Sequence, residues 1–451
     1  MIEKGDKKII RGWVMYDWAN SVYSLVISTA IFPLFYIYET KKVYADKIGA
    51  TDLEAIDEND VTVSFFGYEV SQSVLYTLIL AASFLIISLI SPILSGIADY
   101  TGNKKRFLQF FCYLGALSCM SLFFFDAYNM ELSMIPFLMA SIGYWCSLVF
   151  YNAFLPEIAS AENQDDVSAR GYIMGYIGSV ILLLICIILT QGEKMLGFKN
   201  LNYDMTKYCF ILVGVWWIGF AQVTYRVLPN NPFKKKPEAD YIWKGYKELK
   251  IVYKEFMQTT RLKKYLYAFF FFNSGVQTVM LLATIFASKA VKWPKGGEIS
   301  GLIIAILIIQ ILAAIGAKIM SNVSLKIGNI STLKISVLVW IILCAGAYFI
   351  STPTQFYIMA SGVGLVMGGI QSIARSTYSL YLPETTDHAS YFSFYDVSEK
   401  IGIVIGMGFF ALTEYCFDDI RYSVISVAMF FIIGLFYLFK VPKEESIMKS
   451  I

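Results

Sequence analysis

Charged residues are scarce in this sequence. Only 16% of its 451 residues are Asp, Glu, Lys or Arg, whereas 57% are hydrophobic and the mean hydropathy is +0.59. Soluble globular domains carry about 25% charged residues. The net charge of +3 is small, so nothing in it points to a nucleic-acid partner. The composition predicts a polytopic protein whose surroundings are a lipid bilayer.

Signatures of catalysis and metal binding are missing as well. The sequence has one histidine, His388, and no HExxH, GxSxG or GxxxxGK[ST] pattern. Its seven cysteines form no CxxC pair and lie mostly in apolar runs, as inert buried thiols do. We therefore expect no enzyme activity, no cofactor, no metal site and no use of ATP through a P-loop.

Long apolar runs are what the sequence has instead. A helix needs about 20 mostly apolar residues to cross a bilayer, and twelve runs approach or exceed that length. They cover residues 12–38, 71–97, 107–126, 132–156, 171–191, 208–228, 265–288, 299–320, 331–350, 355–380, 400–416 and 420–439. The runs predict an all-α integral membrane protein with twelve transmembrane helices.

The distribution of positive charge gives these helices an orientation. Most of the 37 Lys and Arg residues fall on the loops that share a side with both termini. Cytosolic loops carry such an excess, so both termini should be cytosolic and the loop 39–70 should lie outside.

Two halves of the sequence resemble each other. The segment Tyr151–Glu157, YNAFLPE, matches Tyr378–Glu384, YSLYLPE, about half a chain later, and Asn20-Ser21 in the first run matches Asn273-Ser274 in the seventh. Duplicated units of this size are typical of secondary transporters. We predict two pseudo-symmetric six-helix bundles, 1–228 and 265–451 with a short tail, joined by a basic linker with an amphipathic helix at 229–264.

The first run carries polar residues that a membrane span rarely tolerates. On a helical period Asp17, Asn20, Ser21 and Ser24 share one face. An acidic side chain at the bilayer centre costs about 2.5–3.5 kcal/mol, so it usually faces a bundle interior or a wet cavity. This face should therefore point to protein or water.

Similar polar faces occur on the fourth, seventh and tenth runs. Together with the first run they predict a substrate cavity, although polar residues that only hold helices together are an alternative. The candidate cavity residues are Asp17, Asn20, Ser24, Tyr144, Tyr151, Asn273, Gln277, Gln371 and Arg375.

A charged turn follows the second run. Its sequence, SGIADYTGNKKR at 95–106, resembles the signature loop of the major facilitator superfamily, with Asp99 and Gly102 in register. Ser95 and Tyr100 depart from the pattern, and the matching loop 321–329 has Leu325 where the acid would be. We expect a charge network at the cytosolic helix ends, made by Asp99, Gly102, Lys104, Glu157 and Arg170.

Further motifs resemble one branch of that superfamily, the autophagy-related vacuolar amino-acid effluxers and their bacterial relatives. They are YDWANS at 16–21, FYNAFLPE at 150–157, SARGY at 168–172, GGIQSIARS at 368–376 and FSFYD at 392–396. The resemblance implies a transporter in a bacterial inner membrane whose first, fourth, seventh and tenth helices line the cavity. Ser274 stands where relatives tend to carry an acid, so a second intramembrane carboxylate is missing there.

The leading hypothesis is a secondary active transporter that moves a small molecule, such as an amino acid, by alternating access. Arg375 is the candidate cation for a substrate carboxylate, and Asp17 the candidate carrier if protons are the coupling ion. Alternatively, Arg375 and Asp17 form a permanent structural pair, or Asp17 pairs with Arg170. Export of drugs or other metabolites, and a receptor or scaffold that transports nothing, are the competing functions.

Overall fold

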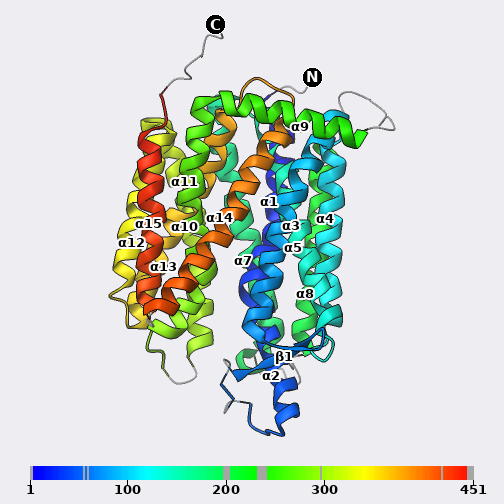
Figure 1. The fold of residues 1–451 in the computed structure, drawn as a ribbon, viewed down its shortest axis with the longest axis vertical. Coiled ribbons are helices and arrows are strands. Elements are labelled where there is room, and N and C mark those ends of the chain that lie inside the picture. Colours follow the sequence, from blue (N-terminus) through cyan, green and yellow to red (C-terminus); the bar gives the residue numbers. More distant parts are fainter. Residues whose placement is uncertain are drawn as a thin grey trace.

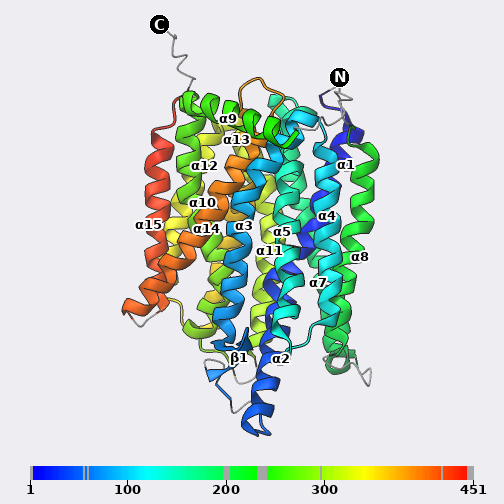
Figure 2. The same ribbon diagram turned by 45° about the vertical axis from the view of Figure 1, so that its right-hand side comes forward.

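The computed structural model describes residues 4–53, 56–57, 60–196, 204–230, 241–294, 297–417 and 420–443. In that part, twelve helical stretches are long and apolar enough to cross a membrane, as predicted. Figures 1 and 2 show them standing side by side as one bundle. The fold is an all-α membrane bundle, to which one short β-hairpin is added.

The helices that precede the middle of the chain contact one another extensively, with α1 against α7 and α8, and α4 against α5 and α8. Their bounds are α1 (Lys7–Val22), the π-helix η1 (Tyr23–Ala30), α2 (Ile31–Ile48), α3 (Gln72–Thr101), α4 (Lys104–Ser121), α5 (Met130–Asn152), α6 (Leu155–Ile158), α7 (Gln164–Leu196) and α8 (Asp204–Val227). Short 3₁₀ turns cover Leu122–Phe124 and Ala161–Asn163.

The helices of the second group also contact one another, with α10 against α14 and α15, and α11 against α13. Their bounds are α10 (Thr260–Ala290), α11 (Glu298–Ile327), α12 (Asn329–Ala347), α13 (Pro353–Leu380), α14 (His388–Phe417) and α15 (Ile420–Phe439). Below, "N-terminal half" means α1 to α8 and "C-terminal half" means α10 to α15.

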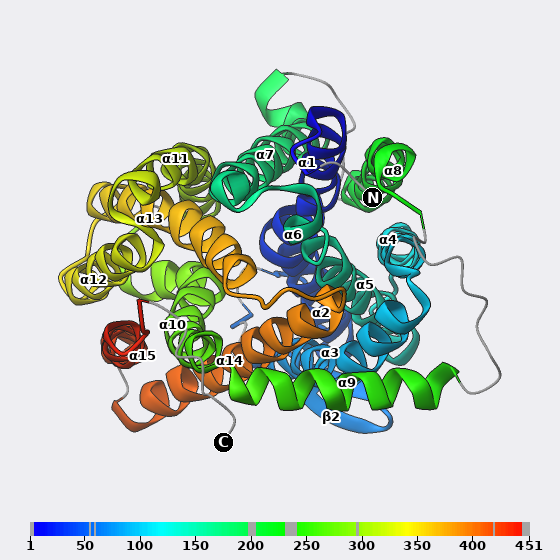
Figure 3. The ribbon, with the colours of Figure 1, turned by 90° about the horizontal axis from the view of Figure 1, so that it is seen from above.

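One helix lies outside both groups. The amphipathic helix expected in the linker is α9 (Tyr241–Gln258), and it runs across the ends of the bundle (Figure 3). Val252 and Phe256 on its apolar side are buried, and α9 contacts α3 of one half and α14 of the other. Residues 231–240, with the lysine cluster 234–236, lie outside the described residues, and the division at 228 and 264 stays a prediction.

The two ends of the bundle differ. The helix α1 begins and α15 ends at the face that carries α9, which we call the terminal face (Figure 1). At the opposite face the strands β1 (Thr62–Phe65) and β2 (Tyr68–Ser71) form an antiparallel hairpin, so we call it the hairpin face. The segment 39–70, predicted to be a loop, is instead helical up to Ile48 and contains most of the hairpin. That it lies outside the cell stays a prediction.

The start of the eleventh membrane helix also differs from the expectation. The apolar run begins near residue 400, but α14 already begins at His388. Polar residues of its first turns face other helices, and Asp396 and Lys400 are both buried. A search for apolar runs misses such a helix start, because these polar turns are covered by other helices and not by lipid.

Candidate central site

The acid of the first helix and the arginine of the tenth membrane helix meet between the halves. Asp17 lies ten residues into α1, roughly 15 Å from its start, and its Oδ2 is 3.3 Å from both Nη1 and Nη2 of Arg375 on α13. Tyr151 of α5 donates a hydrogen bond of 2.8 Å to the same oxygen. We call Asp17 and Arg375 the central ion pair.

Arg375 is held by more than its counter-ion. Its Nε donates to Ser168 Oγ at 3.0 Å and its Nη2 to the Ser168 carbonyl at 2.8 Å, while Nη1 also donates to Asn152 Oδ1 at 3.3 Å. A guanidinium has five N–H donors, and among the described residues each has an acceptor. Residues of α1, α5 and α7 in the N-terminal half thus accept hydrogen bonds from one side chain of the C-terminal half.

Aromatic rings enclose this pair. The guanidinium carbon of Arg375 lies 4.2 Å from the centre of the Tyr172 ring and 5.0 Å from that of Trp13, distances at which a ring face attracts a cation. Trp13 stacks on Tyr151 with ring centres 4.4 Å apart. Gly171 of α7 leaves the necessary room, because a Cβ there would meet Asp17 Oδ2.

A second group of charges lies on α14, where the sequence analysis proposed no site. Lys400 Nζ is 3.0 Å from Asp396 Oδ1 and 2.7 Å from Glu399 Oε2. We call these three residues the α14 triad. Asn273 and Gln277 of α10, both predicted cavity residues, donate to Glu399 Oε1 at 3.3 Å and 2.9 Å. The Asp396–Lys400 spacing of four residues, one helical turn, was the signal that could have revealed it.

The remaining predicted cavity residues fall into two groups. Gln371 accepts a hydrogen bond of 2.6 Å from Tyr176 of α7 and so also bridges the halves. Asn20 is buried, and its amide nitrogen has no partner among the described residues. Tyr144 instead packs on Tyr23 with ring centres 4.7 Å apart, and Ser24 offers its carbonyl to Thr29 within η1.

The charge network at the terminal face has most of the expected members. Asp99 accepts backbone N–H bonds from Ala389 and Ser390 at the start of α14, at 3.2 Å and 2.7 Å. Lys104 lies 4.0 Å from Asp99 and pairs with Glu157, whose Oε1 is 2.9 Å from His388 Nδ1. Gly102 supplies the turn with a φ of +68°.

Arg170 was wrongly included in that network. Its side chain is 59% exposed and pairs with Asp166 one turn earlier on α7, so it reaches neither Asp99 nor Asp17. Its neighbour Asp165 has the bridging role instead. Asp165 accepts hydrogen bonds of 2.8 Å from Ser324 and from Asn329, in the loop that lacks an acid of its own.

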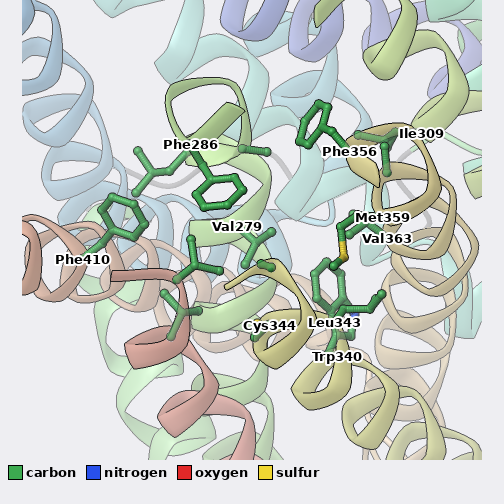
Figure 4. A pocket seen from close by; sticks show the side chains of 16 residues that line it. Val279, Phe286, Ile309, Trp340, Leu343, Cys344, Phe356, Met359, Val363 and Phe410 are labelled. Carbon is green, nitrogen blue, oxygen red and sulfur yellow. The ribbon is translucent and has the colours of Figure 1, made fainter. Parts of the chain in front are cut away.

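The structure also has an apolar cavity inside the C-terminal half (Figure 4). Val279, Phe286, Trp340, Phe356 and Phe410 are among the side chains around it. None of the predicted substrate residues lines this cavity. It is therefore separate from the central ion pair and from the α14 triad.

Comparison with known proteins places this architecture in a family. The model of the Atg22-like vacuole effluxers matches residues 5–450. The chain belongs to the Atg22-like family. It is 31% identical to YxiO, an MFS-type transporter of Bacillus subtilis, over 96% of this chain and 95% of that protein. It is 23% identical to autophagy-related protein 22 of Kluyveromyces lactis, over 95% and 92% of the two chains.

Solved structures agree with this family at the level of the fold. The outward conformation of the major facilitator transporter FucP has a TM-score of 0.68 at 11% identity and covers 98% of this chain and 99% of its own. The human organic anion transporter MFSD10 has a TM-score of 0.66 at 12% identity, with 97% and 100% covered. The family match and the similarity to YxiO, with which this fold agrees, make the protein a membrane transporter of the major facilitator superfamily and not an enzyme.

Proposed function

We propose that this protein is a secondary active transporter that moves small zwitterions, amino acids first among them, across the membrane by alternating access, with protons as the coupling ion. The terminal face would be cytosolic, in a bacterial inner membrane. The observation that carries the proposal is the central ion pair. It joins the halves on the terminal-face side of the bundle, because Arg375 lies only five residues before the end of α13 and its partners Asn152 and Ser168 lie near the adjoining ends of α5 and α7. A substrate that moves along the interface between the halves has to pass this pair.

The contacts of Arg375 suggest how a substrate would act. Every donor of the guanidinium is engaged in this conformation, so a substrate carboxylate has to compete with Asp17 for the same fork. Replacing one carboxylate by another would release α1 from α13 while keeping the buried cation paired. Substrate binding and separation of the halves would then be one event, as alternating access requires.

Asn20 adds a second polar contact for such a ligand. It lies one turn after Asp17 on α1, and its buried amide nitrogen is an unused donor among the described residues. A buried donor without a partner costs about 1–3 kcal/mol, which a ligand oxygen would recover.

The test is uptake into proteoliposomes with an imposed pH gradient. The probes are radiolabelled glycine, leucine, glutamate and lysine, supplied one at a time. Arg375→Lys keeps the charge but loses the fork, so transport of the accepted amino acid should fall at least about tenfold, the equivalent of one charged hydrogen bond. Arg170→Lys, the same change at an exposed pair, is the matched control and should transport normally.

Two results would refute the proposal. One is uptake of all four probes no faster than in protein-free vesicles, with a folded protein by thermal melting. The other is normal transport by Arg375→Lys, which would remove the guanidinium from the substrate path.

A further inference from the structure

The helix α9 lies crosswise to the membrane helices, along one edge of the bundle near its terminal face (Figures 1 and 3). A Cβ added to Gly245 of α9 would meet Ile97 of α3, so the two backbones touch. Ile97 is four residues before the end of α3, roughly 6 Å. The helix α9 therefore packs against the side of the bundle and not on top of it.

This depth corresponds to the surface of the hydrocarbon layer. The 30 residues of α3 span about 45 Å, whereas the hydrocarbon core of a bilayer is about 30 Å thick. Each end of α3 therefore extends several ångströms into the headgroup layer. Amphipathic helices that lie in a bilayer surface occupy the boundary between headgroups and acyl chains, and the position of α9 matches that boundary.

Side chains on α9 form stripes, because residues three or four apart along a helix share a face. The stripe that packs on the bundle consists of Gly245, Leu249, Val252 and Phe256. Beside it runs an exposed stripe of large apolar and aromatic residues, which we call the aromatic stripe: Trp243, Tyr246, Tyr253 and Met257. Farthest from the bundle are three exposed lysines, which we call the outer lysines: Lys247, Lys250 and Lys254. The face of α9 that the protein leaves uncovered is thus aromatic on one side and basic in its centre.

Contacts with α14 show which way the two flanks of α9 point. Tyr253 of the aromatic stripe packs on Phe394, with ring centres 6.0 Å apart. On the opposite flank, Glu255 accepts a hydrogen bond of 3.4 Å from the hydroxyl of Tyr391. Since α14 begins at the terminal face, Phe394 lies about one turn deeper in the bundle than Tyr391. The aromatic stripe therefore points toward the membrane interior, and the acidic flank points toward the terminal face.

The uncovered face of α9 has the composition of a membrane anchor. Trp243 is 70% exposed, and exposed stripes of large apolar residues mark contact surfaces. Tryptophan and tyrosine are enriched where acyl chains meet headgroups. No acid in the described part of the chain pairs with the outer lysines, and each lysine near an anionic lipid surface strengthens the attraction severalfold. Depth, direction and charge thus all favour lipid as the layer that covers this face.

We propose that α9 is a binding site for anionic phospholipids of the membrane that surrounds the bundle. The aromatic stripe inserts between acyl chains at the boundary near the terminal face, and the outer lysines bind the headgroup phosphates. The acidic flank, which lipid phosphates would repel, is turned away from the bilayer. This site is separate from the central ion pair, so the proposal does not depend on the substrate or on the direction of transport.

The depth of the aromatic stripe can be measured by fluorescence quenching in the full-length protein. The protein carries Cys416→Ser, which removes the exposed native thiol, and Tyr246→Cys labelled with bimane, in nanodiscs of phosphatidylcholine. Bromine atoms on the upper part of the acyl chains should quench this label, whereas iodide in the water should not. Glu255→Cys, an exposed position on the opposite flank of the same helix, is the matched control and should show the reverse. Quenching of the Tyr246→Cys label by iodide but not by bromine would overturn the proposal and make the stripe a docking surface for a soluble partner.

The preference for anionic lipid can be measured by electron paramagnetic resonance. In phosphatidylcholine vesicles, wild type should immobilise spin-labelled phosphatidylglycerol in preference to spin-labelled phosphatidylcholine, and salt should weaken this preference because it screens charge. Replacing all three outer lysines by glutamine should lower the preference at least about twofold. Replacing them by arginine is the matched control, since it keeps the charge and should keep the preference.

Two results would contradict the role of the outer lysines. One is an unchanged preference in the glutamine variant, which would place the anionic lipid elsewhere on the protein. The other is an equal loss of preference in the glutamine and arginine variants, which would mean that the lipid does not recognise positive charge on α9.

Discussion

The pair α1 and α7 in the N-terminal half has a counterpart in α10 and α14 of the C-terminal half. In both pairs a serine of the first helix fits against a glycine of the second, Ser21 at Gly175 and Ser274 at Gly402. Close helix contacts in membranes use small residues in this way. The match of Asn20-Ser21 to Asn273-Ser274 thus reflects a shared packing unit, and the serine faces a helix and not a cavity.

The charges on the two pairs are arranged differently. In the N-terminal half the acid sits on α1, and its cation comes from the other half. In the C-terminal half the acids sit on α14, and their cation is on the same helix. Rocking of the halves must therefore break the central ion pair, whereas the α14 triad can move as one body. The same packing unit thus contributes to an ion pair between the halves in one case and to ion pairs within a single helix in the other.

The largest effect is expected when the central ion pair loses its negative charge. Asp17→Asn leaves Arg375 buried without a counter-ion, which costs about 3 kcal/mol, or roughly a hundredfold in a conformational equilibrium. The protein should shift toward a state open at the terminal face, where water can reach the guanidinium. The measurement is thiol labelling of Ser372→Cys, a buried position where α13 meets α7.

The native Cys416 has to be replaced by serine first, because it is exposed and would react with the thiol reagent. The six other cysteines are buried and can stay. Ser372→Cys should be protected with Asp17 present and labelled in Asp17→Asn. Equal protection in both proteins would mean that the ion pair does not hold the halves together.

A smaller shift should follow from the acid at the terminal face. Asp99 accepts two backbone N–H bonds, and an asparagine can accept through one oxygen only, so Asp99→Asn should cost about 2 kcal/mol. Asp165→Asn should cost less, because the new amide can still accept from Asn329 and donate to Ser324. The same labelling of Ser372→Cys ranks the two variants, and an equal response would mean that the backbone bonds to Asp99 hold the halves no more firmly than the side-chain bonds to Asp165.

The shared packing unit can be tested by filling its glycines. Gly175→Ala and Gly402→Ala each place a Cβ against a serine oxygen, and overpacking of this kind costs about 1–2 kcal/mol. Both should lower the melting temperature in detergent by a few degrees. Ser274→Ala should restore Gly402→Ala, since it removes the colliding oxygen; no recovery would show that the two residues are not in contact.

The substitution expected to disturb the protein least is the one that tests its membrane topology. With Cys416 replaced, Thr51→Cys at an exposed position beyond α2 should react with an impermeant thiol reagent added to intact cells. Labelling only after lysis would place the hairpin face in the cytosol and reverse the orientation proposed for the protein.

The sequence predicted the twelve spans because each is a long apolar run, and it identified Asp17 and Arg375 because charge inside such a run is costly. It could not show that Ser168 and Asn152 take up the remaining donors of Arg375, since those contacts depend on how two halves dock. Nor did it locate the α14 triad. Asp396 and Glu399 precede the apolar run and Lys400 is its first residue, so hydropathy placed them at a loop. Only packing against α3, α5 and α10 brings them into the membrane bundle.

For Arg170 the prediction was wrong although the sequence already contained its partner. Its position at the start of a membrane helix suggested a partner in the network of Asp99, but helix geometry offers Asp166 one turn away. A local partner needs no particular docking of the halves, so it is available to Arg170 in every conformation.

The helix α9 has a consequence for the speed of transport. It rests on α3 through Gly245, which sits so close to Ile97 that no side chain fits between them, and it touches α14 through Phe256 and Phe394, with ring centres 5.4 Å apart. When the halves part at the terminal face, the looser aromatic contact is the one to yield. We therefore expect Phe256→Ala, which removes this contact, to change the rate at which the halves part and hence the turnover rate, while the affinity for substrate stays as in wild type.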